Sequence, residues 1–406
     1  MFIRLLASKP NADCEQIVAS PQSGLGRHLR RTVGARIRRF EYGKINPMNE
    51  RVISSLDQVT TDWLTAVLAR SGALTVGIVV RFDVEAGKGN WSTSGRLHLH
   101  YSQDAQGDLP ESLFLKLVNT NTGDGEFFGP SEVAYYTRDY LGVKDAPLLR
   151  CYDGRFSKAL QRYHLLLEDV SQTHIEAVDK TPTLAYGFAL AEGLAVLHAH
   201  WWGAQRLAEA NALIHEPGHI RRFVAIAEPG AGHIIRQLAV ELEPHWPDAI
   251  RELFDRHPQA MIARERNANG FTLIHGDVGQ TNVLLPRVGE RPLYIIDRQP
   301  FDWSLTTWLG VYDLAYAIVL DWEVEKRRRL EMPVLHHYHE WLIKRGVQGY
   351  SWEQLFDDYR LCVAMGVYIA VEYCRGGINR DQDIWLAMLQ RALTACDDLD
   401  CANLWR

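Results

Sequence analysis

The order of the secondary-structure patterns constrains the fold of this chain more than any other feature of its sequence. Apolar runs separated by glycine-containing turns predict strands at 76–84, 96–101, 112–118, 148–152 and 163–168. One predicted helix, 130–140, is inserted among them. Helical spacing dominates afterwards, at 184–202, 232–256, 310–324, 335–345, 352–374 and 382–395. Strands first and helices second predict an α+β protein, with a small antiparallel sheet followed by a mainly helical part.

Three segments are expected in a chain of 406 residues, which is longer than one ordinary domain. They are residues 1–47, 48–168 and 169–406. The first segment carries nine Lys/Arg against three Asp/Glu, a net charge of 9 − 3 = +6, and lacks sustained periodicity. We interpret it as a disordered leader, or as a start that really lies at Met48, in preference to a targeting presequence.

Charge and composition exclude several functional classes. The 44 basic and 50 acidic residues give a net charge of −6, so no positive field favours nucleic acid. No apolar run is long enough to span a bilayer, and no signal peptide opens the sequence, which together favour a cytoplasmic protein. The six cysteines are scattered without a Cys-x-x-Cys pair, which disfavours zinc ribbons and disulfide scaffolds.

The segment 271–285 and the apolar run after it carry the most informative pattern. Apolar residues flank His275, Gly276, Asp277 and Asn282, and the run that begins at Leu293 ends in Asp297. The spacing of Asp277 and Asn282 suits two ends of a loop, and a strand-ending carboxylate beside it makes an oxygen-rich site of the kind that Mg²⁺ prefers. Phosphoryl transfer needs these residue types, a carboxylate for the attacking hydroxyl and an amide oxygen plus a carboxylate for the metal. A surface loop with a capping Asp and a turn Asn is the alternative.

His275-Gly-Asp277-x4-Asn282 followed by Ile-Ile-Asp297 resembles the catalytic and metal motifs of the aminoglycoside phosphotransferase and choline kinase superfamily, which has a bilobal, protein-kinase-like fold. The resemblance implies that Asp277 is the catalytic base and that Asn282 and Asp297 bind Mg²⁺. His275 and Gly276 would shape the loop. It also implies a small β-sheet lobe with one helix of the αC type and a large helical lobe, joined near residue 168.

Further features follow in the order that this resemblance implies. Lys116 lies inside an apolar strand, where a lysine is costly unless it is paired or faces a ligand. The resemblance implies that Lys116 holds the α- and β-phosphates of ATP and that Glu132, sixteen residues on, orients it. Either residue alone is more often a surface charge.

Two other segments are implied to contact ATP. The turn 86–95 contains Gly87, Gly89 and Ser92, whose backbone and hydroxyl groups would approach the phosphates, although glycine-rich hairpins are usually only hairpins. The strand 163–170 resembles the hinge between lobes. Backbone groups around Glu168 and Val170 would there bind the adenine edge.

The C-terminal half adds family features. Residues 197–202 resemble a helix of the ecdysteroid-kinase-like (CHK kinase-like) branch; its two histidines, two residues apart, favour packing and hydrogen bonding over metal binding. The segment 308–316 resembles a family helix whose aspartate, here Asp313, supports the catalytic loop. Arg298 departs from the pattern, because the family often carries a large apolar residue after the metal-binding aspartate.

The leading interpretation is therefore an ATP- and Mg²⁺-dependent phosphotransferase that moves the γ-phosphate of ATP to a hydroxyl of a small molecule. Candidate walls of the acceptor site are Trp303, Trp308, Asp321 and Trp322. Because the basic run 326–329 follows the few acidic residues there, a neutral or apolar alcohol is favoured over a polycationic aminoglycoside. An aminoglycoside phosphotransferase, a nucleotide-binding pseudokinase and a protein kinase are the alternatives. His-Gly-Asp in place of His-Arg-Asp, and the lack of an Ala-Pro-Glu segment, argue against the last.

Overall fold

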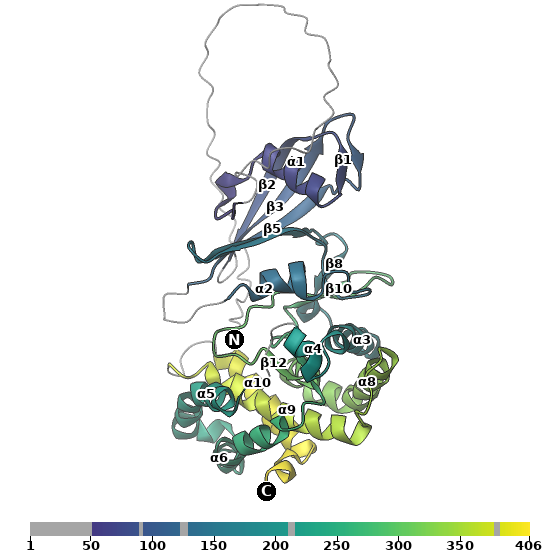
Figure 1. Cartoon of the computed structure of the whole chain (residues 1–406). Coiled ribbons are helices and arrows are strands. Elements are labelled where there is room, and N and C mark those ends of the chain that lie inside the picture. Colours follow the sequence, from purple (N-terminus) through teal and green to yellow (C-terminus); the bar gives the residue numbers. More distant parts are fainter. Residues whose placement is uncertain (1–50, 89–91, 122–128, 210–215, 377–381) are drawn as a thin grey trace, which may run out of the picture.

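The computed structural model describes residues 51–88, 92–121, 129–209, 216–376 and 382–406. The segment 1–47 and the predicted phosphate-binding Gly89 lie outside the described residues. Figure 1 shows a smaller lobe of strands above a larger lobe of helices, with the C-terminus at the far end of the helical lobe. This mixed α+β architecture confirms the fold class that the sequence predicts.

The smaller lobe is built on a five-stranded antiparallel sheet with the order β2-β3-β5-β7-β6. Its strands are β2 (Val79–Lys88), β3 (Ser92–Tyr101), β5 (Ser112–Asn119), β6 (Cys151–Ser157) and β7 (Arg162–Glu168). A separate pair is formed by β1 (Leu74–Val76) and β4 (Gln106–Gly107). The predicted strand 76–84 is therefore two strands broken at Gly77, whose φ of +87° turns the chain. The predicted strand 148–152 is wrong in its bounds, since β6 begins at Cys151.

Helix α1 (Thr61–Arg70) covers one face of this sheet. The side chain of Thr60 caps it by accepting a hydrogen bond from the N–H of Trp63, as Thr does at helix starts. Trp63, Leu64, Val67 and Leu68 pack against strand residues such as Leu115 in one apolar cluster. Since alternate strand residues face opposite sides, Lys116 lies on the other face, toward α2 (Ser131–Ala134). A π-helical turn, η3 (Tyr135–Asp139), extends α2 to nearly the predicted helix 130–140.

The larger lobe contains helices around two small sheets. Its strands are β8 (His174–Glu176), β10 (Val283–Pro286) and β11 (Tyr294–Ile295) in one sheet, and β9 (Phe271–Leu273) and β12 (Thr307–Leu309) in the other. Its helices are α3 (Leu184–His200), α4 (Ala204–Glu209), α5 (Pro217–Gln237), α6 (Trp246–Glu265), α7 (Val311–Ala315), α8 (Val324–Lys344), α9 (Trp352–Glu372) and α10 (Gln382–Asp398). Single turns are η2 (Leu56–Gln58), η4 (Ala177–Asp179), η5 (Ala239–Glu241), η6 (Tyr316–Leu320) and η7 (Cys401–Leu404).

The predicted helix 310–324 ends at Leu320, where the π-helical turn η6 closes it. Prolines account for the errors at the predicted helices 232–256 and 335–345. The predicted helix 232–256 is two helices, because α5 ends at Gln237 and α6 begins at Trp246 with a proline in its first turn. Helices α5 and α8 continue through Pro229 and Pro333, which sequence patterns treat as breaks. Packing stabilises both helices against the lost hydrogen bond. By contrast, α9, whose buried face spans most of its length, agrees closely with the predicted 352–374.

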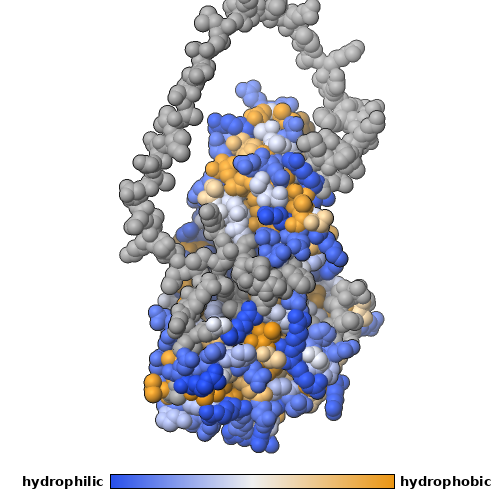
Figure 2. Space-filling model, turned by 90° about the vertical axis from the view of Figure 1, so that its left-hand side faces the viewer, coloured by the Kyte–Doolittle hydropathy of each residue, from blue (hydrophilic) through white to orange (hydrophobic). Residues whose placement is uncertain are grey.

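The surface of the smaller lobe carries apolar side chains, as the patch on that lobe in Figure 2 shows. Its exposed apolar residues include Val76, Ile78, Val80 and Val84, on or next to the edge strand β2. Within the described part of the chain, no helix combines the length and the apolar composition that a membrane crossing requires.

Candidate active site

Asp313 in α7 stabilises the loop between β9 and β10 through hydrogen bonds to the loop backbone. This fully buried carboxylate accepts hydrogen bonds from the backbone N–H groups of His275 at 2.7 Å and Gly276 at 2.8 Å. It also contacts Nε2 of His198 at 3.0 Å, as the preference of that histidine for packing and hydrogen bonding predicts. Burial acts to raise the pKa of Asp313, but these partners hold it below its ordinary value. Asp313 therefore fixes the loop as an anion, which fits the supporting role implied by the sequence.

His275 connects this loop to the strand that precedes Asp297. Its Nδ1 accepts the N–H of Asp277 at 3.3 Å, and its Nε2–H donates to the carbonyl of Ile296 at 3.0 Å. Burial lowers the pKa of His275 to about 4, so the ring is neutral and has one donor and one acceptor. Gly276, between His275 and Asp277 in the chain, has a φ of +86°, a conformation that favours glycine.

Asp277 is buried, and both of its carboxylate oxygens have fixed donors. The hydroxyl of Tyr316 donates to Oδ1 at 2.5 Å, and Nδ2 of Asn282 donates to Oδ2 at 2.6 Å. Burial raises the pKa of Asp277 to about 7, while the Tyr316 hydrogen bond opposes that rise. A carboxylate with this pKa is suited to accept a proton near neutral pH.

Sequence reasoning did not identify Tyr316 as a site residue. It lies at the start of the π-helical turn η6, three residues after Asp313. Such turns often occur at functional sites, but they leave no simple mark in the sequence. Tyr316 becomes a hydrogen-bond partner of Asp277 only when η6 packs against the loop, so the sequence alone does not identify it.

Asn282 and Asp297 lie at the same end of one antiparallel strand pair. Val283 in β10 pairs with Ile295 in β11, and the N–H of Ile296 donates to the carbonyl of Asn282 at 2.9 Å. Asp297 has a φ of +69°, which is uncommon outside glycine and is typical of strained functional positions. One amide and one carboxylate oxygen form a hard donor set that suits Mg²⁺ shared with phosphates. The described residues contain no group of three or more His, Cys, Asp or Glu that could hold a metal by itself.

Lys116 joins the two lobes at this point. Its Nζ lies 2.7 and 2.9 Å from the two carboxylate oxygens of Glu132 in α2, and 2.5 Å from Oδ1 of Asp297. Burial acts to lower the pKa of Lys116, but the two carboxylates raise it, so the amine is charged. The structure thus brings together the lysine and glutamate that the sequence pairs, and adds Asp297 to them.

The two residues after Asp297 extend this network. Gln299 donates from Nε2 to Glu132 at 3.0 Å and to the hydroxyl of Tyr163 at 2.6 Å, and that hydroxyl donates to Glu132. Buried Arg298 donates from Nε to the carbonyl of Ile274 at 3.0 Å and from Nη1 to Oγ of Ser131 at 2.7 Å. Arg298 therefore ties the start of α2 to the catalytic loop through hydrogen bonds. Sequence reasoning did not identify these partners.

The predicted nucleotide contacts come from the end of β2, the start of β3 and the end of β7. Gly87 is near the end of β2, and a Cβ there would come within 2.7 Å of Oγ of Ser94. Ser92 opens β3. At the hinge, the N–H of Glu168 donates to the carbonyl of Arg150, and the carbonyl of Val170 accepts from the N–H of His174. The N–H of Glu168 and the carbonyl of Val170 already form hydrogen bonds within the protein. The proposed contacts with a base would therefore come from the other backbone groups of these residues and their neighbours.

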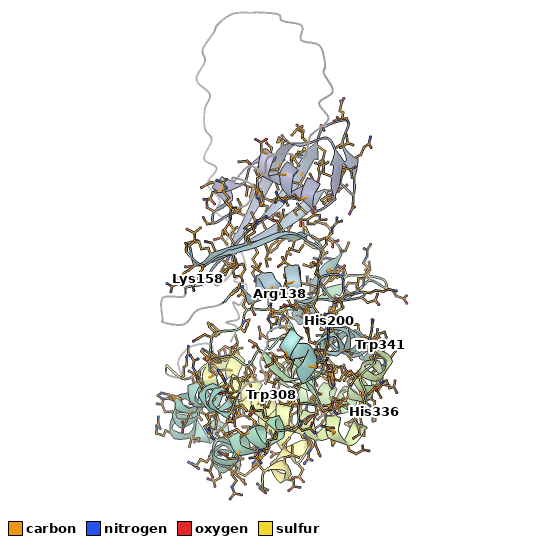
Figure 3. All side chains as sticks on the ribbon, viewed as in Figure 1. Arg138, Lys158, His200, Trp308, His336 and Trp341 are labelled. Atoms are coloured by element: carbon orange, nitrogen blue, oxygen red, sulfur yellow. The ribbon has the colours of Figure 1, made fainter. Side chains whose placement is uncertain are left out.

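The predicted acceptor walls separate into different roles. Trp303 lines a small cavity of about 30 Å³ beside Gly276. Trp308 and Trp322 do not line it, because both are buried in the core, against Phe271 and Tyr186 respectively. Figure 3 shows Trp308 inside the helical lobe. Asp321 accepts the N–H of Gln280 at 2.6 Å and so supports the catalytic loop.

The fold and this arrangement define a bilobal protein of the protein-kinase-like type. A structure from Ralstonia eutropha assigned as an aminoglycoside phosphotransferase has a TM-score of 0.52 with this chain, at 14% identity over 86% of this chain and 99% of that one. Choline kinase from Cryptosporidium parvum has a TM-score of 0.53, at 9% identity over 85% and 98% of the two chains. The fold is thus the one found in the aminoglycoside phosphotransferase and choline kinase superfamily. No protein-family model and no curated protein matches the sequence.

Proposed function

We propose that this chain is an ATP- and Mg²⁺-dependent phosphotransferase that phosphorylates a hydroxyl group of a small molecule. The observation that carries the proposal is the meeting of three distant segments at Lys116, which contacts both Glu132 and Asp297. Asp277 and Asn282 lie in the adjoining loop, where the charge of Asp297 acts on the Asp277 carboxyl. A phosphate-binding cation, two hard oxygen ligands and a base near neutral pKa are the parts that phosphoryl transfer requires.

In the proposed mechanism, Lys116 binds the phosphates of ATP, and the turn that contains Gly87 and Ser92 covers them. Asn282 and Asp297 would hold Mg²⁺, which when bound neutralises phosphate charge. The acceptor hydroxyl gives its proton to Asp277 while its oxygen bonds to the γ-phosphorus and the bond to ADP breaks. Tyr316 and Asn282 keep the carboxylate of Asp277 in place during this step.

A screen of acceptors coupled to ADP release tests the proposal. We expect ADP release that a small alcohol stimulates and that chelation of Mg²⁺ abolishes, with GTP run in parallel to ATP. Stimulation by aminoglycosides alone would favour the aminoglycoside phosphotransferase alternative, and phosphorylation of a generic protein would favour the protein kinase. Nucleotide binding without turnover of any acceptor would indicate a pseudokinase. The cytoplasmic location stays a prediction.

The pH dependence of kcat should depend on the hydrogen bond between Tyr316 and Asp277, because that bond affects the pKa of the proposed base. Because the base must be ionised, we expect kcat to rise with pH through about 7. Tyr316→Phe removes a donor that lowers the pKa of Asp277, so the acidic limb should move to higher pH by about one unit. The measurement is the kcat–pH profile, with Tyr312→Phe as the matched control that leaves the limb in place. An unchanged limb in Tyr316→Phe would remove Tyr316 from the mechanism.

A further inference from the structure

Arg96 lies on the same face of the five-stranded sheet as Lys116. In the antiparallel pairing of β3 with β5, Ser94 is opposite Lys116 and Arg96 is opposite Phe114. Since residues two apart on a strand face the same side, Arg96 and Phe114 share the face of Lys116. Both side chains are partly exposed, whereas Leu115 is buried on the other face, against α1. The part of this face next to Lys116 therefore carries a guanidinium and an aromatic ring.

This part of the face extends from Lys116 toward the hinge between the lobes. In the pairing of β5 with β7, Leu113 is opposite Glu168, the last residue of β7. The three residues from Lys116 to Leu113 span about 10 Å of strand, a length over which a nucleotide can extend from its phosphates to its base. A nucleotide whose phosphates meet Lys116 and whose base reaches the end of β7 must therefore pass Arg96.

Two carboxylates hold the guanidinium of Arg96 in place. Its Nη1 donates to Oε2 of Glu85 in β2 at 2.7 Å, and its Nε lies 2.9 Å from Oδ2 of Asp169, directly after β7. Asp169 also accepts hydrogen bonds from Oγ of Ser112 at 2.8 Å and from the N–H of Ser171 at 3.0 Å. Burial acts to raise the pKa of Asp169, but these partners hold it below its ordinary value, so the carboxylate is charged. One guanidinium thus lies between two carboxylates and has no excess positive charge for a phosphate.

We propose that Arg96 binds the nucleotide by stacking its guanidinium on the base. A guanidinium is planar and stacks on aromatic faces, and a purine offers such a face. Because Glu85 and Asp169 already fix the group, little conformational freedom is lost when the base binds. The charge of Arg96 is compensated, so the contact depends on the base and not on the phosphates. The inference rests on the proposed function, since it takes the phosphates to be held at Lys116.

Calorimetry of the full-length protein with two probes, in the presence of Mg²⁺, tests the proposal. The probes are ADP and ribose 5-diphosphate, which is ADP with a hydroxyl in place of the base. Wild type should bind ADP more tightly than ribose 5-diphosphate. Arg96→Leu should weaken ADP binding by about tenfold and leave the affinity for ribose 5-diphosphate unchanged, because only the base contact is lost. Equal weakening of both probes, no change in either, or no binding of ADP to wild type would overturn the proposal.

Two further variants separate stacking from charge and from the fold. Arg96→Lys keeps the positive charge near Asp169, but an ammonium group cannot stack as a plane, so ADP binding should stay weakened by at least about threefold. Recovery to the wild-type affinity would show that only the charge matters. Arg81→Leu is the matched control, because Arg81 is paired with Asp83 and lies opposite His100, beyond the level of the last β7 residue. It should leave ADP affinity unchanged, and the Tm of each variant checks its fold.

The binding measurements need no turnover, so this inference and the proposed function can fail separately. Wild-type ADP affinity in Arg96→Leu, together with ADP release that an alcohol stimulates, would remove the role of Arg96 and leave the phosphotransferase intact. A base-dependent loss of ADP binding in Arg96→Leu, with no ADP release from any acceptor in wild type, would contradict the phosphotransferase and support the contact with the base.

Discussion

Asp277→Asn should lower kcat by about 10²–10⁴-fold, the usual contribution of a positioned base. The substitution keeps the size of the side chain but removes the carboxylate that accepts the acceptor's proton. Asn can still accept the Tyr316 hydroxyl, which donates to Oδ1 of Asp277, but its amide nitrogen cannot accept from Nδ2 of Asn282. Nucleotide affinity therefore checks that the loop keeps its form. The measurement is kcat from ADP release, together with nucleotide affinity.

Two comparisons make this prediction specific. ATP affinity should change little, since the proposed phosphate contacts come from Lys116 and the 86–95 turn. Asp248→Asn, an exposed aspartate in α6, is the matched control and should keep wild-type kcat. Wild-type turnover in Asp277→Asn would refute the assignment of the base.

Asp313→Ala should have the largest effect on stability, about 3–5 kcal/mol of the free energy of unfolding. It leaves the N–H groups of His275 and Gly276 without their buried acceptor and removes the anion beside His198. Urea denaturation measures the change. Because the catalytic loop loses its support, activity should fall even in the folded fraction.

The pH dependence gives Asp313 a distinct signature. Its pKa is below the ordinary value in the folded state, so its contribution to stability is present above the unfolded-state pKa and is lost as the pH falls through the folded one. The difference between wild type and Asp313→Ala should therefore shrink in acid. Asp248→Ala, which breaks only an exposed pair, should cost less than about 1 kcal/mol at any pH. A small, pH-independent loss in Asp313→Ala would contradict the supporting role.

The sequence allowed good prediction of features that depend on neighbouring residues. His275, Asp277 and Asn282 lie within one short loop, and Asp297 lies two residues after β11, the partner of the strand that follows this loop, so their proximity follows from local geometry. The family resemblance implied the Lys116–Glu132 pair, in agreement with the need of a lysine in an apolar strand for a partner. Helix bounds failed where Pro229 and Pro333 lie inside helices, since only packing can offset the hydrogen bond that a proline removes.

Side-chain environments could not be predicted in the same way. Trp303, Trp308 and Trp322 are equivalent in sequence as bulky aromatic residues near the motif, yet one lines the cavity and two lie in the core. Which of them faces a cavity depends on α5, α9 and the segment after Asp297, which are remote in the chain. The same holds for Tyr316 and Gln299, whose partners become neighbours only after folding.

The sequence alone determined the order of strands and helices and the oxygen-bearing residues of one loop and one strand end, because spacing and local backbone geometry set both. The tertiary structure decided which groups complete that site and how Arg298 is accommodated. Burial, charge compensation and the direction of a side chain depend on contacts between distant segments, and those contacts exist only once the two lobes have packed together.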